Sequence, residues 1–340
     1  MQPTVEPAED LAPFELGQGA AQLPDDRALP ALQTIRTLGL TGAMPSLRLG
    51  DGPVGLRIRN YVPGSRATFE AHVGDRRFAV KLYAHDPAPE AEAYQRLAHE
   101  GLARDSGARV PQLLAYERHL RILVLSWLEG PSASRLIREG QGARAGELAA
   151  SWLRACSHRA AGLGPPRGSG HMLYRVGVSV GALSAADPVL GVTAKVAANM
   201  LVLTQPETET LHLVHGSLYA RHILDLGDGP GVIDWQQFGQ GPAEADAGMF
   251  LASVSRLLLR RQASEDEGAQ ATEVFLSGTR GLLDARTLEW YWAAGLLHLA
   301  ASGLKTGRKR EAPREAHALV GEAVWRAESA GSKTVGRRSR

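Results

Sequence analysis

The fold of this chain is decided by the stretch His215-Gly-Ser-Leu-Tyr-Ala-Arg-His222-Ile-Leu-Asp225. A glycine-rich turn, Gly227–Gly231, and the short apolar run Val232-Ile-Asp234 follow it directly. Two short apolar strands joined by such a turn predict a small hairpin. Asp234 ends the second strand, so the hairpin presents an acid close to a loop that contains a serine and two histidines.

The sequence before this stretch has the pattern of an antiparallel sheet with one inserted helix. Alternating or apolar runs bounded by turn residues predict its strands. These strands are expected at 56–62, 67–73, 78–83, 110–116 and 122–128. The helix is expected from Pro89 to about Ala103, between the third and fourth strands.

Beyond Gly130-Pro131 the pattern becomes helical. Asp187-Pro188 is an N-cap followed by proline at the first helical position, and it predicts a helix. The apolar stripe expected on that helix is Val192, Val196, Met200 and Leu203. The chain is therefore expected to be α+β, with a small β-rich lobe, a larger helical lobe and a ligand-binding cleft between them. The expected divisions are a disordered segment 1–23, a β-rich lobe 24–130, a helical lobe 131–304, and a basic helix and tail 305–340.

The composition excludes a chain that is disordered throughout, a collagen and a coiled coil. The chain has 340 residues, of which 44% are hydrophobic and 22% charged, as in ordinary globular proteins. Cys156 is the one cysteine, so no intrachain disulfide can form and a reducing, cytoplasmic location is expected. No signal peptide or membrane-spanning run is recognised. Residues 305–340 hold ten Lys and Arg against four Glu, yet we interpret this charge as a solvated end, and nucleic acid is not an expected partner.

Two familiar motifs occur in the wrong context. Gly50–Gly55 matches G-x-G-x-x-G, but a strand follows it where a dinucleotide site needs a helix. Gly177-Val-Ser-Val-Gly181 matches the nucleophile elbow, but no alternating parallel strand and helix pattern surrounds it. Neither a Rossmann domain nor an α/β-hydrolase is expected.

Lys81 and Glu90 are predicted to form an ion pair. Lys81 lies within the apolar strand Phe78–Tyr83, where its ammonium needs a partner or water. Glu90 shares one helical face with Ala93, Tyr94 and Leu97, which is the apolar and inward face. The alternative for Lys81 alone is a strand lysine that faces solvent.

Four pieces of the sequence follow one another along the chain: Lys81, Glu90, the His215-Gly216 loop, and Asp234 with the later Gly241-Pro-Ala-Glu-Ala-Asp246. Their order and spacing resemble the pattern of the aminoglycoside phosphotransferase and choline kinase family, whose members are small-molecule relatives of protein kinases. The resemblance covers about residues 50–300 and implies a two-lobed protein-kinase-like fold.

The resemblance also implies the role of each residue. Lys81 would hold the phosphates of ATP or GTP, and Glu90 would orient Lys81. Asp234 would bind Mg²⁺ or Mn²⁺, and Asp246 would brace the loop.

Three further residues and a connector are assigned by the same resemblance. The turn Pro63, Gly64 and Ser65 would cover the phosphates. Leu128, in the connector Ile122–Gly130, would lie near the adenine.

Two positions depart from the family pattern. The catalytic aspartate that accepts the hydroxyl proton falls on Ser217, and a metal-binding asparagine falls on His222. Serine is a poor base, and loss of a positioned base typically costs 10²–10⁴-fold in rate. Imidazole suits Mn²⁺ or Zn²⁺ better than Mg²⁺. Three hypotheses remain open: a pseudokinase-like nucleotide-binding protein, an active phosphotransferase acting on a small-molecule hydroxyl, and a scaffold that binds no nucleotide.

The acceptor is not named by the sequence. The helices expected to form its pocket, about 140–205 and 245–300, carry few acids assignable to a cleft. An aminoglycoside is a polycation that needs an acidic pocket, so it is not the expected substrate. A different small molecule or a protein partner remains.

Overall fold

The computed structural model describes residues 23–47, 54–157, 162–207, 210–305 and 312–332. The chain divides into two compact units, Met1–Glu129 and Gly130–Arg340. Residues 1–22 of the segment expected to be disordered, and much of Gly50–Gly55, lie outside the described residues, whereas Leu23 is described and is buried.

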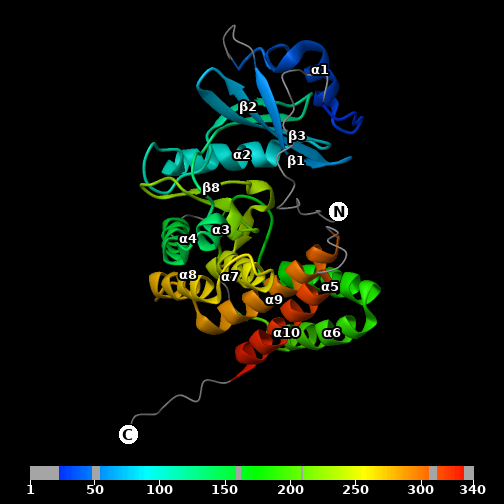
Figure 1. Cartoon of the computed structure of the whole chain (residues 1–340), viewed down its shortest axis with the longest axis vertical. Coiled ribbons are helices and arrows are strands. Elements are labelled where there is room, and N and C mark those ends of the chain that lie inside the picture. The colour runs from blue at the N-terminus through cyan, green and yellow to red at the C-terminus, as the bar shows by residue number, and fades with distance from the viewer. Residues whose placement is uncertain (1–22, 48–53, 158–161, 208–209, 306–311, 333–340) are drawn as a thin grey trace. The chain divides into compact units, whose positions relative to one another are not determined.

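The first unit is a five-stranded antiparallel sheet with a helix on each face (Figure 1). The strand order is β1-β2-β3-β5-β4, and each neighbouring pair is antiparallel. Its elements are α1 (Pro30–Ala43), β1 (Gly55–Val62), β2 (Arg66–Val73), β3 (Arg76–Tyr83), α2 (Ala88–Leu97), the π-helical turn η2 (Ala98–Leu102), β4 (Leu113–Glu117) and β5 (Ile122–Ser126). The predicted meander is therefore present.

Alternation along the strands assigns the two faces of this sheet. Phe69, Val80 and Val124 belong to one buried cluster with Leu32 and Ile35 of α1. Lys81 lies on the opposite face because it alternates with Val80, and α2 packs there. The face under α1 therefore carries this apolar cluster, and the Lys81–Glu90 pair lies on the face under α2.

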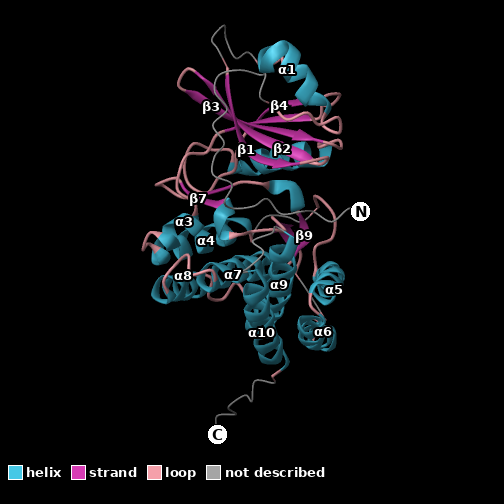
Figure 2. Ribbon diagram, turned by 45° about the vertical axis from the view of Figure 1, so that its right-hand side comes forward, coloured by secondary structure: helices cyan, strands magenta, loops and turns pink. Residues whose placement is uncertain are grey.

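The second unit is mainly helical (Figure 2). Its helices are α3 (Ala133–Arg138), α4 (Gly142–Cys156), α5 (Ser169–Ala186), α6 (Pro188–Leu203), α7 (Ala243–Leu259), α8 (Glu265–Gly278), α9 (Ala285–Lys305) and α10 (Ala312–Gly331). α7 and α10 both pack on α9, while α4 packs on α8 and α5 on α6. α5 is a continuous helix through Gly177–Gly181, so the nucleophile-elbow interpretation is excluded.

Two short ribbons interrupt these helices and carry the decisive stretch. β6 (His212–Val214) pairs with β9 (Gly239–Gly241), and β7 (Ile223–Asp225) pairs with β8 (Pro230–Val232). The 3₁₀ turns η3 (Ala220–His222) and η4 (Trp235–Gln237) lie between them. The β7–β8 ribbon is the hairpin that the glycine turn predicts.

The stripe expected on α6 faces solvent, so that part of the sequence interpretation is wrong. Val192 is 63% and Leu203 84% exposed, whereas Gly191 and Ala194 are buried. A Cβ at Gly191 would lie 2.6 Å from the Cα of Ser184, which shows how closely α6 approaches α5. The buried face of α6 therefore follows Gly191, and it consists of Leu190, Gly191, Ala194, Ala197 and Leu201.

Within the described residues, no helix is long and apolar enough to cross a bilayer.

Candidate functional site

Lys81 and Glu90 form a buried ion pair in the first unit. Lys81 Nζ lies 2.6 Å from Glu90 Oε1, and each residue is 5% exposed. Lys81 sits in the middle of the sheet, between Thr68 of β2 and Leu123 of β5. The predicted pair is present, and burial of both charges is tolerable only because each neutralises the other.

Glu90 is placed by the start of α2. It lies in the first turn of that helix, where the helix dipole favours a carboxylate. Its second oxygen, Oε2, accepts a 2.6 Å hydrogen bond from the hydroxyl of Tyr83. Burial, together with the negative charge of Glu90, raises the pKa of Tyr83 well above its usual value, so this phenol stays a donor. Glu90 is thus held by two donors from β3.

The turn that contains Pro63, Gly64 and Ser65 joins β1 to β2. Gly64 has a φ of 70° and Ser65 O accepts a 2.8 Å bond from Ala84 N, directly after β3. The N–H of Gly64 donates to Asp26 Oδ2 at 2.7 Å. The turn therefore lies at the same end of the sheet as Tyr83, but an internal carboxylate already uses one of its backbone donors.

The connector with Leu128 follows β5. Leu128 is half-buried, and the neighbouring Trp127 donates from its indole nitrogen to Glu129 at 3.0 Å. The guanidinium groups of Arg59 and Arg77 each lie 5.6 Å from the centre of the Trp127 ring. The contacts of the Trp127 ring with Glu129 and with the two guanidinium groups thus hold this segment in place. The first unit ends at Glu129.

Asp246 shapes the loop of the decisive stretch in the second unit. Its Oδ2 accepts from the N–H of His215 at 2.7 Å and its Oδ1 from that of Gly216 at 2.9 Å. Gly216 has a φ of 75°, and a Cβ there would lie 2.1 Å from Gln237 O. Burial raises the pKa of Asp246 to about 7, although both backbone bonds oppose the shift. This is the bracing contact that the resemblance implies.

Ser217 lies at the turn of this loop and carries no carboxylate. Its Oγ is 3.4 Å from His215 Nδ1, and His215 Nε2 is 2.9 Å from the carbonyl of Ile233. A carbonyl can only accept, so Nε2 carries a proton, and in the neutral imidazole Nδ1 is an acceptor. The serine hydroxyl is thus positioned to donate toward the imidazole, which is the opposite of a proton-accepting aspartate.

His222 and Asp234 face one another. His222 Nδ1 is 2.8 Å from Ser217 O and therefore carries its proton, which leaves a lone pair on Nε2. That Nε2 lies 3.7 Å from Asp234 Oδ2. Burial lowers the pKa of His222 well below its usual value, and the neighbouring Arg221 adds to the effect. A neutral imidazole lone pair and a carboxylate that face one another at this distance are a pair of donors for a cation.

Asp234 adopts an unusual backbone conformation. Its φ and ψ are 70° and 60°, in the left-handed region that few residues other than glycine visit. Aspartate tolerates this region better than most, and such strain clusters at functional sites. No group of three or more metal-ligating side chains occurs in the described part of the chain, so any ion here would take its other ligands from a bound molecule or water.

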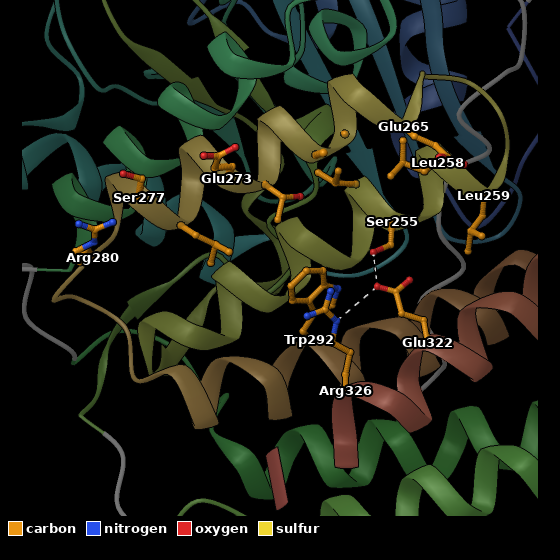
Figure 3. A pocket seen from close by; sticks show the side chains of 15 residues that line it. Ser255, Leu258, Leu259, Glu265, Glu273, Ser277, Arg280, Trp292, Glu322 and Arg326 are labelled. Atoms are coloured by element: carbon orange, nitrogen blue, oxygen red, sulfur yellow. Dashed lines mark hydrogen bonds and ion pairs between the residues drawn. The ribbon is translucent and has the colours of Figure 1, made fainter. Parts of the chain in front are cut away.

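A cavity of about 880 Å³ lies elsewhere in the second unit, among α7, α8, α9 and α10 (Figure 3). Glu322 accepts from Ser255 at 2.9 Å, and the Arg326 guanidinium lies 3.2 Å from the centre of the Trp292 ring. None of the site residues predicted from sequence lines it. Two of its charges pair with one another, because Arg326 Nε lies 3.6 Å from Glu322 Oε1, and Arg326 also meets Glu289.

Comparison with known proteins gives the class first. The structure is similar to a thermostable mutant of aminoglycoside phosphotransferase APH(4)-Ia, with a TM-score of 0.58, 16% identity, and coverage of 85% of this chain and 99% of that one. A choline/ethanolamine kinase family protein from Mesorhizobium loti matches with a TM-score of 0.55 and 16% identity over 88% of this chain and 95% of that one. Choline kinase from Cryptosporidium parvum matches with a TM-score of 0.54 and 10% identity over 81% and 89%. At these identities the likeness is one of fold, a protein-kinase-like α+β fold.

A model of the phosphotransferase enzyme family matches residues 62–280, which is more than half of the chain. The chain belongs to this family. No curated protein matches it.

Three contacts near the predicted residues were missed in the sequence. Asp26 binds Gly64 and Tyr61 across more than thirty residues. Arg144 forms two 2.8 Å bonds with the carboxylate of Asp225. Neither contact has a periodic signal, because each joins segments far apart in the chain.

The third missed group is Arg167, His171 and Arg175, which are four residues apart. This spacing places His171 and Arg175 on one face of a helix, so the signal was present in the sequence.

Proposed function

We propose that the chain binds a purine nucleoside triphosphate with a divalent cation and is impaired in phosphoryl transfer. The observation that carries this is the buried 2.6 Å pair of Lys81 and Glu90. A structural protein gains little from such a pair, because an apolar pair of equal size is often as stable. A lysine held at a fixed place is what phosphate binding needs.

His222 and Asp234 fit a cation by their donor chemistry. Together they offer one nitrogen lone pair and one carboxylate at 3.7 Å. Nitrogen favours Mn²⁺ over Mg²⁺. The cation would neutralise phosphate charge, and the two side chains would hold it against the nucleotide.

The impairment rests on Ser217. The residue at this position takes the acceptor's proton in the family pattern, but the Ser217 hydroxyl points to a lone pair on His215. A neutral hydroxyl with pKa far above 7 cannot perform this step well. Phosphoryl transfer depends mostly on positioning and charge, so slow residual turnover is compatible with the site.

The test is thermal unfolding of the full chain with ATP or GTP and with Mg²⁺ or Mn²⁺. A ligand at one hundred times its dissociation constant stabilises by about 2.7 kcal/mol, which is a measurable shift. We expect the shift to be larger with Mn²⁺ and to vanish in Lys81→Ala and Asp234→Asn. Asparagine also tolerates the left-handed region, so the second variant removes charge without adding strain.

Arg76→Ala is the matched control, because it removes a positive charge from an exposed position of the same strand. It should keep the nucleotide shift. A well-folded wild-type protein that shows no shift with any combination would overturn the proposal and leave the scaffold hypothesis.

A further inference from the structure

Two arginines and two histidines gather beside the Ser217 loop. Arg167 Nη1 is 2.9 Å from His171 Nε2, and Arg175 Nη2 is 2.7 Å from His298 Nε2 of α9. The other terminal nitrogen of Arg175, Nη1, lies 3.4 Å from the carbonyl of Gly216. The cluster thus reaches the residue next to Ser217, and all four side chains are half-buried.

The histidines do not offset the charge of the arginines. A guanidinium only donates, so each imidazole must accept through Nε2 and is neutral. Burial, with the charges of Arg167 and Arg175, lowers the pKa of His171 to about 4. Burial and Arg175 also lower the pKa of Arg167 to about 10, so this group stays protonated at neutral pH.

In the described part of the chain, no carboxylate forms an ion pair with Arg167 or Arg175. The partners of Arg167 and Arg175 there are imidazoles and the carbonyls of Phe238 and Gly216. Half-buried charges without a counter-ion are costly to the fold. By contrast, Arg144 and Arg326, two other half-buried arginines of this unit, each meet carboxylates. The difference indicates a counter-ion that comes from outside the described residues, and a bound ligand can supply it.

We propose that Arg167 and Arg175 bind an anionic group, a phosphate or a carboxylate, of the small molecule that this site accepts. This rests on the proposed function, because it makes the site beside Ser217 an acceptor site. Arginine presents its donors as a planar fork that matches phosphate and carboxylate oxygens. Arg167 also immediately precedes the first turn of α5, so the positive end of that helix dipole adds to the attraction.

A ligand that binds these two arginines is an anion, whereas an aminoglycoside, which the resemblance suggests, is a polycation. A polycation would be repelled by the two guanidinium groups, of which that of Arg175 lies 3.4 Å from the carbonyl of Gly216. An acceptor with one anionic end would instead be anchored there, beside Gly216 of the loop. The substrate class is therefore an anionic metabolite rather than an aminoglycoside.

The test measures binding of inorganic phosphate and of malonate by calorimetry and thermal unfolding, with chloride at equal ionic strength as the reference. We expect phosphate or malonate to stabilise the wild-type protein, and the preferred one identifies the anionic group. Loss of a charge-assisted hydrogen bond weakens binding by roughly tenfold or more, which is the effect expected of Arg167→Gln and Arg175→Gln. Lys195→Gln removes the same charge from an exposed position of α6 and should have no effect.

The nucleotide site provides the crossed control. Lys81→Ala should lose the nucleotide shift and keep the anion shift, and Arg167→Gln should do the reverse. If the anion shift instead disappears in Lys81→Ala and survives in both arginine variants, the anion occupies the nucleotide site and the inference is wrong. An absence of any anion shift in the wild-type protein would overturn it as well, whatever the nucleotide result. Unfolding midpoints without ligand show whether Arg175→Gln, which loses its bond to Gly216, is folded.

Discussion

Lys81 donates to Glu90 across 2.6 Å, with side chains only 7% and 6% exposed. Each charge is tolerable in this position only while the other is present. The pair therefore fixes the Lys81 ammonium in one place. Substitution of Lys81 and substitution of Glu90 leave different buried charges behind. Removal of Lys81 leaves a buried carboxylate without its cation, whereas removal of the charge of Glu90 leaves a buried ammonium that lies 5.9 Å from the centre of the Tyr83 ring.

A double-mutant cycle tests this relationship. Lys81→Met should lower the free energy of unfolding by about 3 kcal/mol, because it leaves Glu90 as an uncompensated buried charge. Lys81→Met with Glu90→Gln should be more stable than Lys81→Met alone, since the amide is neutral and still accepts from Tyr83. Urea unfolding of the four proteins at pH 7 gives the coupling energy. Additive effects of the two substitutions would contradict a coupled buried pair.

Restoration of the family pattern should raise turnover. Ser217→Asp with His222→Asn supplies a base and an amide oxygen at the two divergent positions. A positioned general base contributes about 10²–10⁴-fold, so ATP hydrolysis measured by ADP release should rise by at least tenfold over the wild-type rate. His222→Asn alone is the control, and it should shift the metal preference from Mn²⁺ toward Mg²⁺ without the increase. A wild-type rate that falls in Ser217→Ala would show instead that the serine is competent.

Patterns with a local cause could be predicted from the sequence. The β3 strand and the inward face of α2 follow from residue alternation and spacing, and together they predict the Lys81–Glu90 pair. The turn at Gly227–Gly231 predicts the β7–β8 ribbon, because glycine tolerates the positive φ that a tight turn needs, as Gly227 shows with a φ of 85°, and proline fixes its own φ. The match to the phosphotransferase family confirms the resemblance, and the structure confirms the fold class.

Contacts that depend on close packing could not be predicted in this way. The exposed Val192 and Val196 of α6 have helical spacing, but Gly191 decides which face is buried because it permits close approach to Ser184. The bond between Asp26 and Gly64 joins two turns without any repeating pattern. The roles of Ser217 and His222 remain predictions, since they concern chemistry that geometry alone does not test.

Gly216 should be irreplaceable by alanine. Its φ is positive, and the added Cβ would lie 2.1 Å from the carbonyl of Gln237, so the loop would have to move. Gly216→Ala should cost several kcal/mol in unfolding free energy, since strain and a backbone clash act together. Gly227 also has a positive φ, 85°, but has open space around it, so Gly227→Ala should cost only about 1 kcal/mol. Equal costs for the two variants in thermal unfolding would show that the clash is relieved cheaply.

Asp246 should make stability depend on pH in an unusual direction. Its pKa is about 7 in the folded chain, compared with 3.8 for an unperturbed aspartate, so the folded state holds the proton more tightly than the unfolded state. Its contribution is therefore fully present below about pH 4 and is lost as the pH rises through 7. The wild-type protein should gain stability relative to Asp246→Asn by about 1 kcal/mol per unit as the pH falls from 7 to 5.5, in urea unfolding.

Asp225→Asn provides the opposite case for the same measurement. Hydrogen bonds from Arg144 hold the pKa of Asp225 below 3.8, so this residue stabilises above its unfolded pKa and loses its contribution only in stronger acid. The difference in free energy of unfolding between Asp225→Asn and the wild-type protein should therefore be constant between pH 5.5 and 8. If the difference in free energy of unfolding between Asp246→Asn and the wild-type protein were equally constant, the two backbone hydrogen bonds from His215 and Gly216 would outweigh the effect of burial on the pKa of Asp246. Asp246 would then be an ordinary ionised brace rather than a group that titrates near neutrality.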